Sequence, residues 1–271
     1  MKNRLKQKLS ILLAISILLL TIIPNVFNAA HAITNGEPDG NNHPYVCLVV
    51  VDIDGQPAFR GTGVLISPYI VLTAGHLTDG ADGARVWFDE VVQGNPEYPY
   101  PGTTSIEGTP ITHDGYYGTS DSGLAGLNWQ DVGVVVLDEP VNGLGFGVLP
   151  AIGLVDTLGP KTDLDQVGYG VQEQVHGGGP PYWVGDKVRL FAPAQLIPSK
   201  DVLADDFIKT TANPGQGKGG TAFGDSGGPV FLAGTNIIVG LTSWGWNYNC
   251  AGISYAARVD TAIVQDWISA H

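Results

Sequence analysis

The chain has 271 residues, 44% hydrophobic and 14% charged, and this composition excludes an intrinsically disordered protein. Its 13 basic and 26 acidic residues give a formal net charge of −13. Such an acidic chain argues against a nucleic-acid partner, because nucleic acids bind proteins mainly through positive charge. The 38 glycines and 18 prolines predict many turns and short strands rather than long helices.

The first 32 residues have the pattern of a secretory signal peptide. Basic residues at positions 2, 4, 6 and 8 precede an apolar run over 9–23, and Ala30-His31-Ala32 forms a small-x-small cleavage site. The run of 15 residues is shorter than the roughly 20 that span a membrane. We therefore expect a secreted, extracellular protein with no membrane contact once the signal is removed. Removal takes away basic residues only, so the mature chain becomes more acidic.

Short apolar strands separated by turns are the main regular elements predicted in the remaining chain. Residues 45–51 are rich in valine and precede Asp54-Gly55, a pair typical of hairpin turns. Further strands are predicted at 63–66, 69–72, 85–88 and 131–137, whereas 94–128 lack a clear period and are expected to form surface loops. After a glycine-rich connection over 141–160, strands are predicted at 166–169, 187–191, 207–211, 230–232, 237–242 and 255–259.

One helix is predicted near the end of the chain. Asp260 is placed to cap it, and Ile263, Val264, Trp267 and Ile268 recur at helical spacing. Many short strands followed by a single helix indicate an all-β fold, either a barrel or a sandwich.

The string GDSGGP at residues 224–229 is the strongest chemical signal, and it admits three interpretations. The first is a glycine-rich turn without chemistry. The second is the nucleophile elbow G-x-S-x-G, which needs a helix after the serine and then an acidic residue and a histidine. Here Pro229 and the strand-like VFLAG follow, and the only histidine downstream is His271. Chain order and context therefore disfavour the elbow.

The third interpretation makes Ser226 the nucleophile of a His–Asp–Ser triad. His76 ends the apolar stretch VLTAGH, and Asp131 opens the buried strand DVGVVVL, so both lie at strand ends where a barrel faces a cleft. The other candidates fit less well. His43, His113 and His176 have Gly/Pro-rich neighbours and are expected on the surface. The pair formed by His113 and the aspartate after it lies in a loop. The other candidate aspartates, Asp121 and Asp138, do not begin a buried strand.

With these motifs in order, the chain resembles the secreted chymotrypsin/trypsin-like serine protease family. The resemblance rests on ITNG at 33–36, TAGH at 73–76, QDVGVVVL at 130–137, GDSGGP, SWG at 243–245 and the terminal helix with Trp267. It implies two packed antiparallel β-barrels and a C-terminal helix. Residues 33–150 would form the first barrel, with the histidine and the aspartate. Residues 151–271 would form the second, with the serine and the specificity pocket.

The resemblance also implies the role of each site residue. Ser226 attacks the carbonyl, His76 takes its proton, and Asp131 orients the imidazole. The backbone N–H groups of Gly224 and Ser226 form the oxyanion hole. Asp225 pairs with the amino group of Ile33, which signal cleavage after residue 32 would expose. Protein or peptide substrates, a monomer, and no cofactor or metal are expected.

The specificity pocket is expected to lack charge. The same resemblance places its floor at Gly220, followed by Thr221, with Ser243, Trp244 and Gly245 as one wall and Gly252 as part of the other. No carboxylate is among these residues. We therefore expect an uncharged residue on the acyl side of the scissile bond (P1). A cysteine common in relatives is replaced by Leu77.

Several points stay open at this stage. Cys47 and Cys250 could form one disulfide or remain two buried thiols. Acidic residues at 82, 89 and 90 lack the spacing of a calcium cage and are expected to be solvated. A catalytically silent binding module on the same fold and a serine esterase are the alternatives to a protease.

Overall fold

The computed structural model describes residues 36–116, 130–175, 182–200, 203–213, 218–245 and 250–271. The predicted signal peptide, Ile33, Asp121 and His176 lie outside these residues. The longest helix in the described residues has seven residues, far fewer than a membrane crossing requires.

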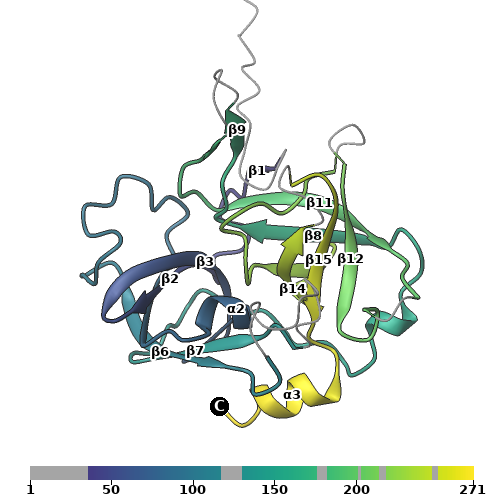
Figure 1. Cartoon of the computed structure of the whole chain (residues 1–271), viewed down its shortest axis with the longest axis horizontal. Coiled ribbons are helices and arrows are strands. Elements are labelled where there is room, and N and C mark those ends of the chain that lie inside the picture. The colour runs from purple at the N-terminus through teal and green to yellow at the C-terminus, as the bar shows by residue number, and fades with distance from the viewer. Residues whose placement is uncertain (1–35, 117–129, 176–181, 201–202, 214–217, 246–249) are drawn as a thin grey trace, which may run out of the picture.

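Two closed antiparallel barrels lie side by side (Figure 1). The first has the strand order β2-β3-β4-β7-β6-β5, formed by β2 (Val46–Ile53), β3 (Gln56–Ser67), β4 (Ile70–Thr73), β5 (Gly83–Trp87), β6 (Ile106–Thr112) and β7 (Gly133–Leu137). The second has the order β11-β12-β15-β14-β13-β8 and closes through pairing of β8 with β11. Its strands are β8 (Asp163–Gly168), β11 (Leu190–Ile197), β12 (Phe207–Ala212), β13 (Pro229–Leu232), β14 (Ile238–Gly245) and β15 (Gly252–Arg258). The predicted all-β, two-barrel fold is confirmed.

Smaller elements complete the architecture. The hairpin of β9 (Glu173–Val175) and β10 (Tyr182–Val184) stands apart from both barrels at the top of Figure 1. The remaining elements are β1 (Glu37–Pro38), α2 (Gly75–Thr78), the 3-10 turn η1 (Val155–Thr157) and α3 (Ala262–Ile268). The glycine-rich connection predicted over 141–160 carries η1 and joins β7 of the first barrel to β8 of the second.

The hydrophobic core is formed by strands whose side chains are buried on both faces. Seven of the eight residues of β2 are buried, and alternate side chains enter different clusters. Cys47, Val49 and Val51 pack with other residues of the first barrel, whereas Val46 and Leu48 belong to a cluster that includes Phe231 and other residues of the second barrel. This shared cluster joins the two barrels through apolar contact.

Each end of the chain crosses to the opposite barrel. Near its start, β1 pairs with β11 of the second barrel. At its end, α3 lies below the barrels in Figure 1, where the ring of Trp267 packs 4.9 Å from that of His113. The predicted domain boundary at residue 150 stays a prediction, because the terminal segments belong to neither barrel alone.

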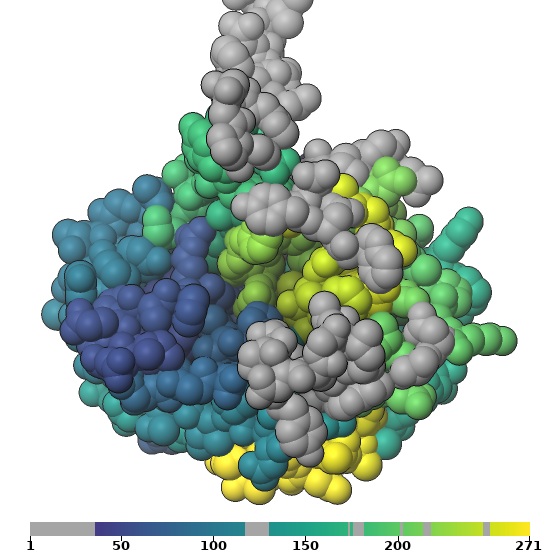
Figure 2. Space-filling view, in the orientation of Figure 1, coloured from purple at the N-terminus to yellow at the C-terminus, as the bar shows by residue number. Residues whose placement is uncertain are grey.

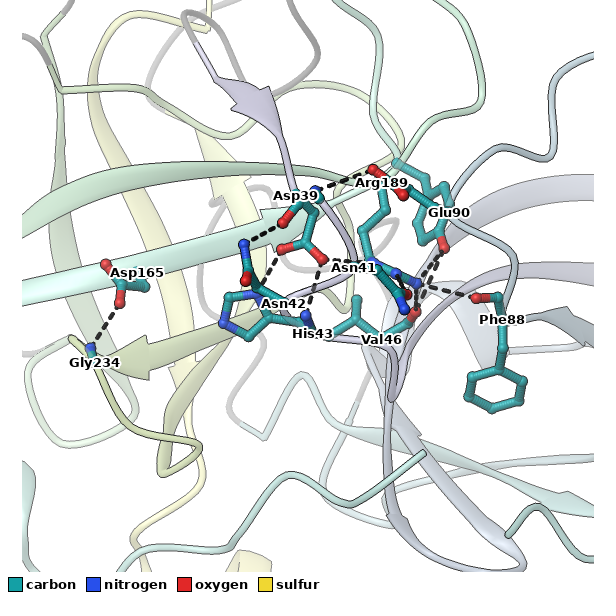
Figure 3. A network of polar contacts seen from close by, with 12 residues as sticks. Asp39, Asn41, Asn42, His43, Val46, Phe88, Glu90, Asp165, Arg189 and Gly234 are labelled. Carbon is teal, nitrogen blue, oxygen red and sulfur yellow. Dashed lines mark hydrogen bonds and ion pairs between the residues drawn. The ribbon is translucent and has the colours of Figure 1, made fainter. Parts of the chain in front are cut away.

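A buried ion pair fixes the N-terminal segment between the barrels (Figure 3). Asp39 and Arg189 are both fully buried, and the Arg189 Nε lies 3.0 Å from a carboxylate oxygen of Asp39. Arg189 also donates to the carbonyls of Val46 and Phe88 in or beside the first barrel. His43 closes the network, with Nδ1 2.6 Å from the second carboxylate oxygen of Asp39.

Some local predictions were wrong. The segment 94–128, which was expected to form loops, contains β6. This strand forms because it pairs with β5 and β7. Asp260 does not cap α3, because its carboxylate accepts bonds from Arg258 and from the N–H of Val155, and the N-cap residue is Thr261. Neither the β9–β10 hairpin nor α2 was predicted.

Candidate active site

His76 lies in the short helix α2, directly after the buried strand β4. Gly75 lets this turn approach the segment before β7, since a Cβ there would lie 3.0 Å from both the backbone nitrogen and the oxygen of Val132. Asp131 sits just ahead of β7, which pairs with β4. Pairing of these two strands therefore brings the histidine and the aspartate together.

The carboxylate of Asp131 is buried and receives three hydrogen bonds. The backbone N–H of His76 donates to Oδ1 at 2.7 Å, and Nδ1 of the same residue lies 2.8 Å from Oδ2. The hydroxyl of Ser243 also donates to Oδ2. With Nδ1 facing a carboxylate, the tautomer that carries its proton on Nδ1 is favoured, which leaves Nε2 as a proton acceptor.

The same contacts shift both pKa values. Burial alone would lower the pKa of His76, but the charge and hydrogen bond of Asp131 outweigh it and raise that pKa above its ordinary value. Burial would raise the pKa of Asp131, yet the bonds from His76 and Ser243 hold it below its usual range. Asp131 therefore remains ionised near neutral pH and stabilises a protonated imidazole.

Ser226 lies on a loop held between the two barrels. Its carbonyl accepts a bond from the N–H of Thr62 at 2.8 Å, and the carbonyl of Gly224 accepts the Thr62 hydroxyl at 3.0 Å. On the other side, the N–H of Gly227 donates to Thr242 of β14 at 2.8 Å. One strand from each barrel therefore positions this serine.

Ser226 and His76 share a cavity of about 500 Å³. It belongs to the hollow that Figure 2 shows between the purple-blue first barrel and the green-yellow second barrel. None of the hydrogen bonds among the described residues joins the Ser226 hydroxyl to the imidazole. Catalytic hydrogen bonds are often loose before substrate binds.

The loop before Ser226 presents backbone donors. Gly224 has φ +96°, a conformation that favours glycine. In the described part of the chain, the N–H groups of Gly224 and Ser226 donate to no other group. Their assignment to an oxyanion hole stays a prediction from the sequence, and these unpaired N–H groups are compatible with it.

Asp225 points away from this cavity into the protein. It is fully buried, and its carboxylate accepts bonds from the N–H groups of Gly170 and Ala222, both at 2.8 Å. Side chains at Gly168 or Gly170 would collide with it, because a Cβ would lie 2.1 or 2.4 Å from a carboxylate oxygen. Its predicted partner, Ile33, lies outside the described residues.

The cavity contains four of the six predicted specificity residues, namely Thr221, Ser243, Trp244 and Gly245. Gly220 is buried but does not line it, and Gly252 is exposed at the start of β15. Four further lining residues were missed, namely Ala222, Phe223, Thr242 and Cys250. The first two directly precede GDSGGP, a proximity that could have identified them.

Cys47 and Cys250 are both buried thiols that form no disulfide with each other, which answers the question left open by the sequence. Cys250 lines the cavity, and burial raises the pKa of its thiol to about 11. Leu77 fills space beside Gly61, since a Cβ on that glycine would lie 2.5 Å from the Leu77 side chain.

The other candidate residues lie away from the serine. His113 is buried against Trp267 and His43 is partly buried beside Asp39, so the prediction that both are surface residues was wrong. Asp138 is exposed and its backbone N–H bonds to Glu107. No group of three potential metal ligands occurs among the described residues.

The two packed barrels define the class of chymotrypsin-like proteins. The sequence profile of the Trypsin family matches residues 33–268, so the chain belongs to this family. The serine protease Hayan of Drosophila melanogaster is 26% identical over 244 residues, which cover 82% of this chain; the chain spans 36% of that relative's length.

Solved structures show the same fold. HL collagenase superimposes with a TM-score of 0.64 at 19% identity, covering 85% of this chain and 94% of that protein. Human heparin binding protein gives a TM-score of 0.60 at 18% identity, with coverage of 87% and 95%. At such identities the likeness concerns the fold alone.

Proposed function

We propose that the protein is a secreted serine endopeptidase that hydrolyses peptide bonds through an acyl-enzyme. The observation that carries this proposal is the bonding of Asp131 to Nδ1 of His76 at a cavity that also contains Ser226. Family membership alone does not establish catalysis, because binding proteins share this fold.

The mechanism follows from the groups present. Nε2 of His76 takes the proton of Ser226 as its oxygen attacks the substrate carbonyl, and Asp131 stabilises the imidazolium that forms. The N–H groups of Gly224 and Ser226 bind the oxyanion. Protonated His76 then gives its proton to the leaving amine, and water repeats the sequence to release the acid.

A fluorophosphonate probe tests this proposal directly. The protein should be labelled on Ser226, and Ser226→Ala and His76→Ala should both abolish labelling. Ser269→Ala and His271→Ala are matched controls, because both residues are exposed at the end of the chain and should leave labelling intact. A folded wild-type protein that resists the probe would contradict the proposed activity.

Two other functions stay as alternatives. A solved protein of the same fold is named for binding heparin, so a silent binding module is the first; it requires the protein to remain unlabelled. A serine esterase is the second, and it requires rapid turnover of simple esters with no turnover of peptides.

The pocket supports a P1 residue without charge. The described residues that line it have hydroxyl, aromatic and small side chains, and the ionisable groups among them are His76 and the Cys250 thiol. A panel of peptides differing at P1 should show cleavage after neutral residues, and strong cleavage after arginine or lysine would contradict this.

The mature amino terminus would complete the site. Cleavage of the signal after Ala32 would expose the amino group of Ile33, and Asp225, buried beside Ser226, is its proposed partner. Export would then activate the enzyme and deliver it outside the cell as a monomer acting on proteins or peptides. N-terminal sequencing of active enzyme tests the start at Ile33.

A further inference from the structure

Arg60 differs from the other arginines of the mature chain. Arg85, Arg189 and Arg258 each form an ion pair with an aspartate. In the region that the structure describes, no carboxylate lies within 4.0 Å of Arg60, and its Nη1 is buried with no hydrogen-bond partner. The chain has twice as many acidic as basic residues. A partly buried arginine without a carboxylate therefore requires an explanation, because desolvated charges are normally paired.

Arg60 lies beside the proposed oxyanion loop. It belongs to β3, and its Nε is 3.7 Å from the position that a Cβ on Gly224 would occupy. It lines a second cavity, of about 380 Å³, that shares Ser226 and His76 with the first and adds Phe59 and Val171. A further hollow of about 530 Å³ continues from Arg60 and Val171 to the β9–β10 hairpin.

A second cation lies near Arg60. Burial and the charge of Arg60 lower the pKa of Lys187, so the two cations repel each other. The Lys187 Nζ lies 5.1 Å from the centroid of the Tyr98 ring, and the charge of Arg60 opposes the effect of burial, which raises the pKa of the Tyr98 hydroxyl. Asp186 also lines the outer hollow and offsets part of this charge without pairing with Arg60.

The position of this cavity determines which part of a substrate it meets. In the proposed protease, the acyl side of the substrate occupies the cavity with Trp244. The substrate chain passes over Ser226, so the substrate residues after the scissile bond enter the cavity lined by Arg60. A guanidinium binds a carboxylate through two parallel hydrogen bonds, and partial burial strengthens the attraction.

We propose that Arg60 is a specificity-determining residue that selects substrates with a carboxylate one or two residues after the scissile bond (P1′ or P2′). The carboxylate belongs either to an aspartate or glutamate side chain or to the C-terminus of a short substrate. This inference rests on the proposed protease function, and it concerns substrate choice rather than the chemical step.

Internally quenched peptides that differ only at P1′ or P2′ test the proposal. Wild-type kcat/KM should be about ten-fold higher for glutamate than for glutamine, the size expected of one charge-assisted interaction. Arg60→Gln should cleave the two peptides at equal rates, and Arg60→Glu should favour lysine. Lys161→Gln is the matched control, because it removes one positive charge outside both cavities and should keep the preference.

Paired peptides with a free or an amidated C-terminus distinguish the two sources of the carboxylate. A preference confined to free termini identifies the terminal carboxylate, and one that survives amidation identifies the side chain. Equal rates for glutamate and glutamine peptides with the wild type would overturn the proposal.

Binding to Ser226→Ala separates this inference from the proposed activity. Without turnover, the affinity for the glutamate peptide should still exceed that for the glutamine peptide, and Arg60→Gln in the same background should abolish the difference. If the wild type hydrolyses no peptide, the proposed protease function is wrong. The difference in affinity between the glutamate and glutamine peptides still shows whether Arg60 binds the carboxylate.

Discussion

Asp131 determines the protonation behaviour of the imidazole in the proposed active site. It holds the His76 pKa above its ordinary value although burial acts in the opposite direction. Because a general base must be neutral, kcat/KM should rise with pH through this raised pKa. In the folded state, the pair stabilises the protein below the ordinary histidine pKa, and this contribution is lost as pH rises through the raised one.

Asp131→Asn should therefore change both the rate and the pH profile. The amide favours the wrong imidazole tautomer, so kcat should fall by about 10⁴-fold, as it does for this change in the family's triad. The acidic limb of kcat/KM should also move to lower pH, because the charge that raises the His76 pKa is gone. Asp138→Asn is the control, because it makes the same change at an exposed aspartate at the opposite end of β7. If the acidic limb of kcat/KM stayed at the same pH in Asp131→Asn, Asp131 would not be the group that raises the His76 pKa.

Gly227 shows where the loop that carries Ser226 requires glycine for space as well as for backbone conformation. Its φ is +78° and that of Gly234 is +72°, so alanine strains both positions. A Cβ on Gly227 would lie 2.1 Å from the Thr73 hydroxyl and 2.5 Å from the Thr62 carbonyl, whereas Gly234 has open space around it.

The comparison of Gly227→Ala with Gly234→Ala therefore isolates the effect of the collision. Gly234→Ala should cost about 1–2 kcal/mol from backbone strain alone. Gly227→Ala should cost about 3 kcal/mol or more and should displace the loop that carries Ser226. Urea unfolding measures both free energies, and fluorophosphonate labelling reports the position of Ser226. Equal losses would show that the contact between the barrels is looser than described.

At the scale of elements, the Asp39–Arg189 pair joins the N-terminal segment, β11 and the first barrel. Arg189→Met should destabilise the protein by about 3–5 kcal/mol, because it removes the buried cation that pairs with Asp39 and leaves that buried carboxylate with its bonds to His43. The double variant Asp39→Leu/Arg189→Met should recover part of this loss, since no uncompensated charge remains.

A surface pair provides the control for this prediction. Lys218 lies 3.3 Å from Asp163, a carboxylate that is 65% exposed. Lys218→Met should leave the urea midpoint unchanged, because exposed ion pairs contribute little. If Arg189→Met also left the midpoint unchanged, the buried pair would have no measurable effect on stability.

The sequence predicted features that depend on neighbouring residues, and it missed features that depend on residues far apart in the chain. Motif order and strand periodicity predicted the fold and the meeting of His76 with Asp131, because β4 and β7 are strongly apolar. β6 was missed because its sequence IEGTPIT is only half-buried, and its pairing partners lie far away in the chain.

The same limit explains the missed site residues. The Ser243 hydroxyl was expected only at the substrate wall, yet it donates to Asp131 across 112 positions of sequence. The isolation of Arg60 from carboxylates depends on where the aspartates fold, which no local pattern records. Asp260 resembles a cap until Arg258 and Val155 are brought beside it.

At the scale of the whole molecule, the two barrels and the N-terminal segment depend on one another. The Ser226 loop is bonded to Thr62 of the first barrel and to Thr242 of the second. Asp225, in the same loop, is buried behind it. We therefore expect a group that enters beside Asp225 to act through the loop backbone on the proposed oxyanion donors, the N–H groups of Gly224 and Ser226.

The proposed amine of Ile33 gives this dependence a pH signature. Paired with buried Asp225, the ammonium should have a pKa above its ordinary range of about 7.7–8.0. The active conformation is then favoured below that range and is lost as pH rises through the raised pKa. The mature enzyme should thus lose kcat/KM on an alkaline limb, in addition to the acidic limb set by His76.

A chain that keeps His31 and Ala32 before Ile33 tests this mechanism. Its amino group cannot reach the same position, so its kcat/KM should be low at every pH and should lack the alkaline limb. The mature chain measured over the same pH range is the matched reference, and circular dichroism checks that both are folded. Full activity of the extended chain at pH 7 would show that the oxyanion loop is ordered by the barrels alone.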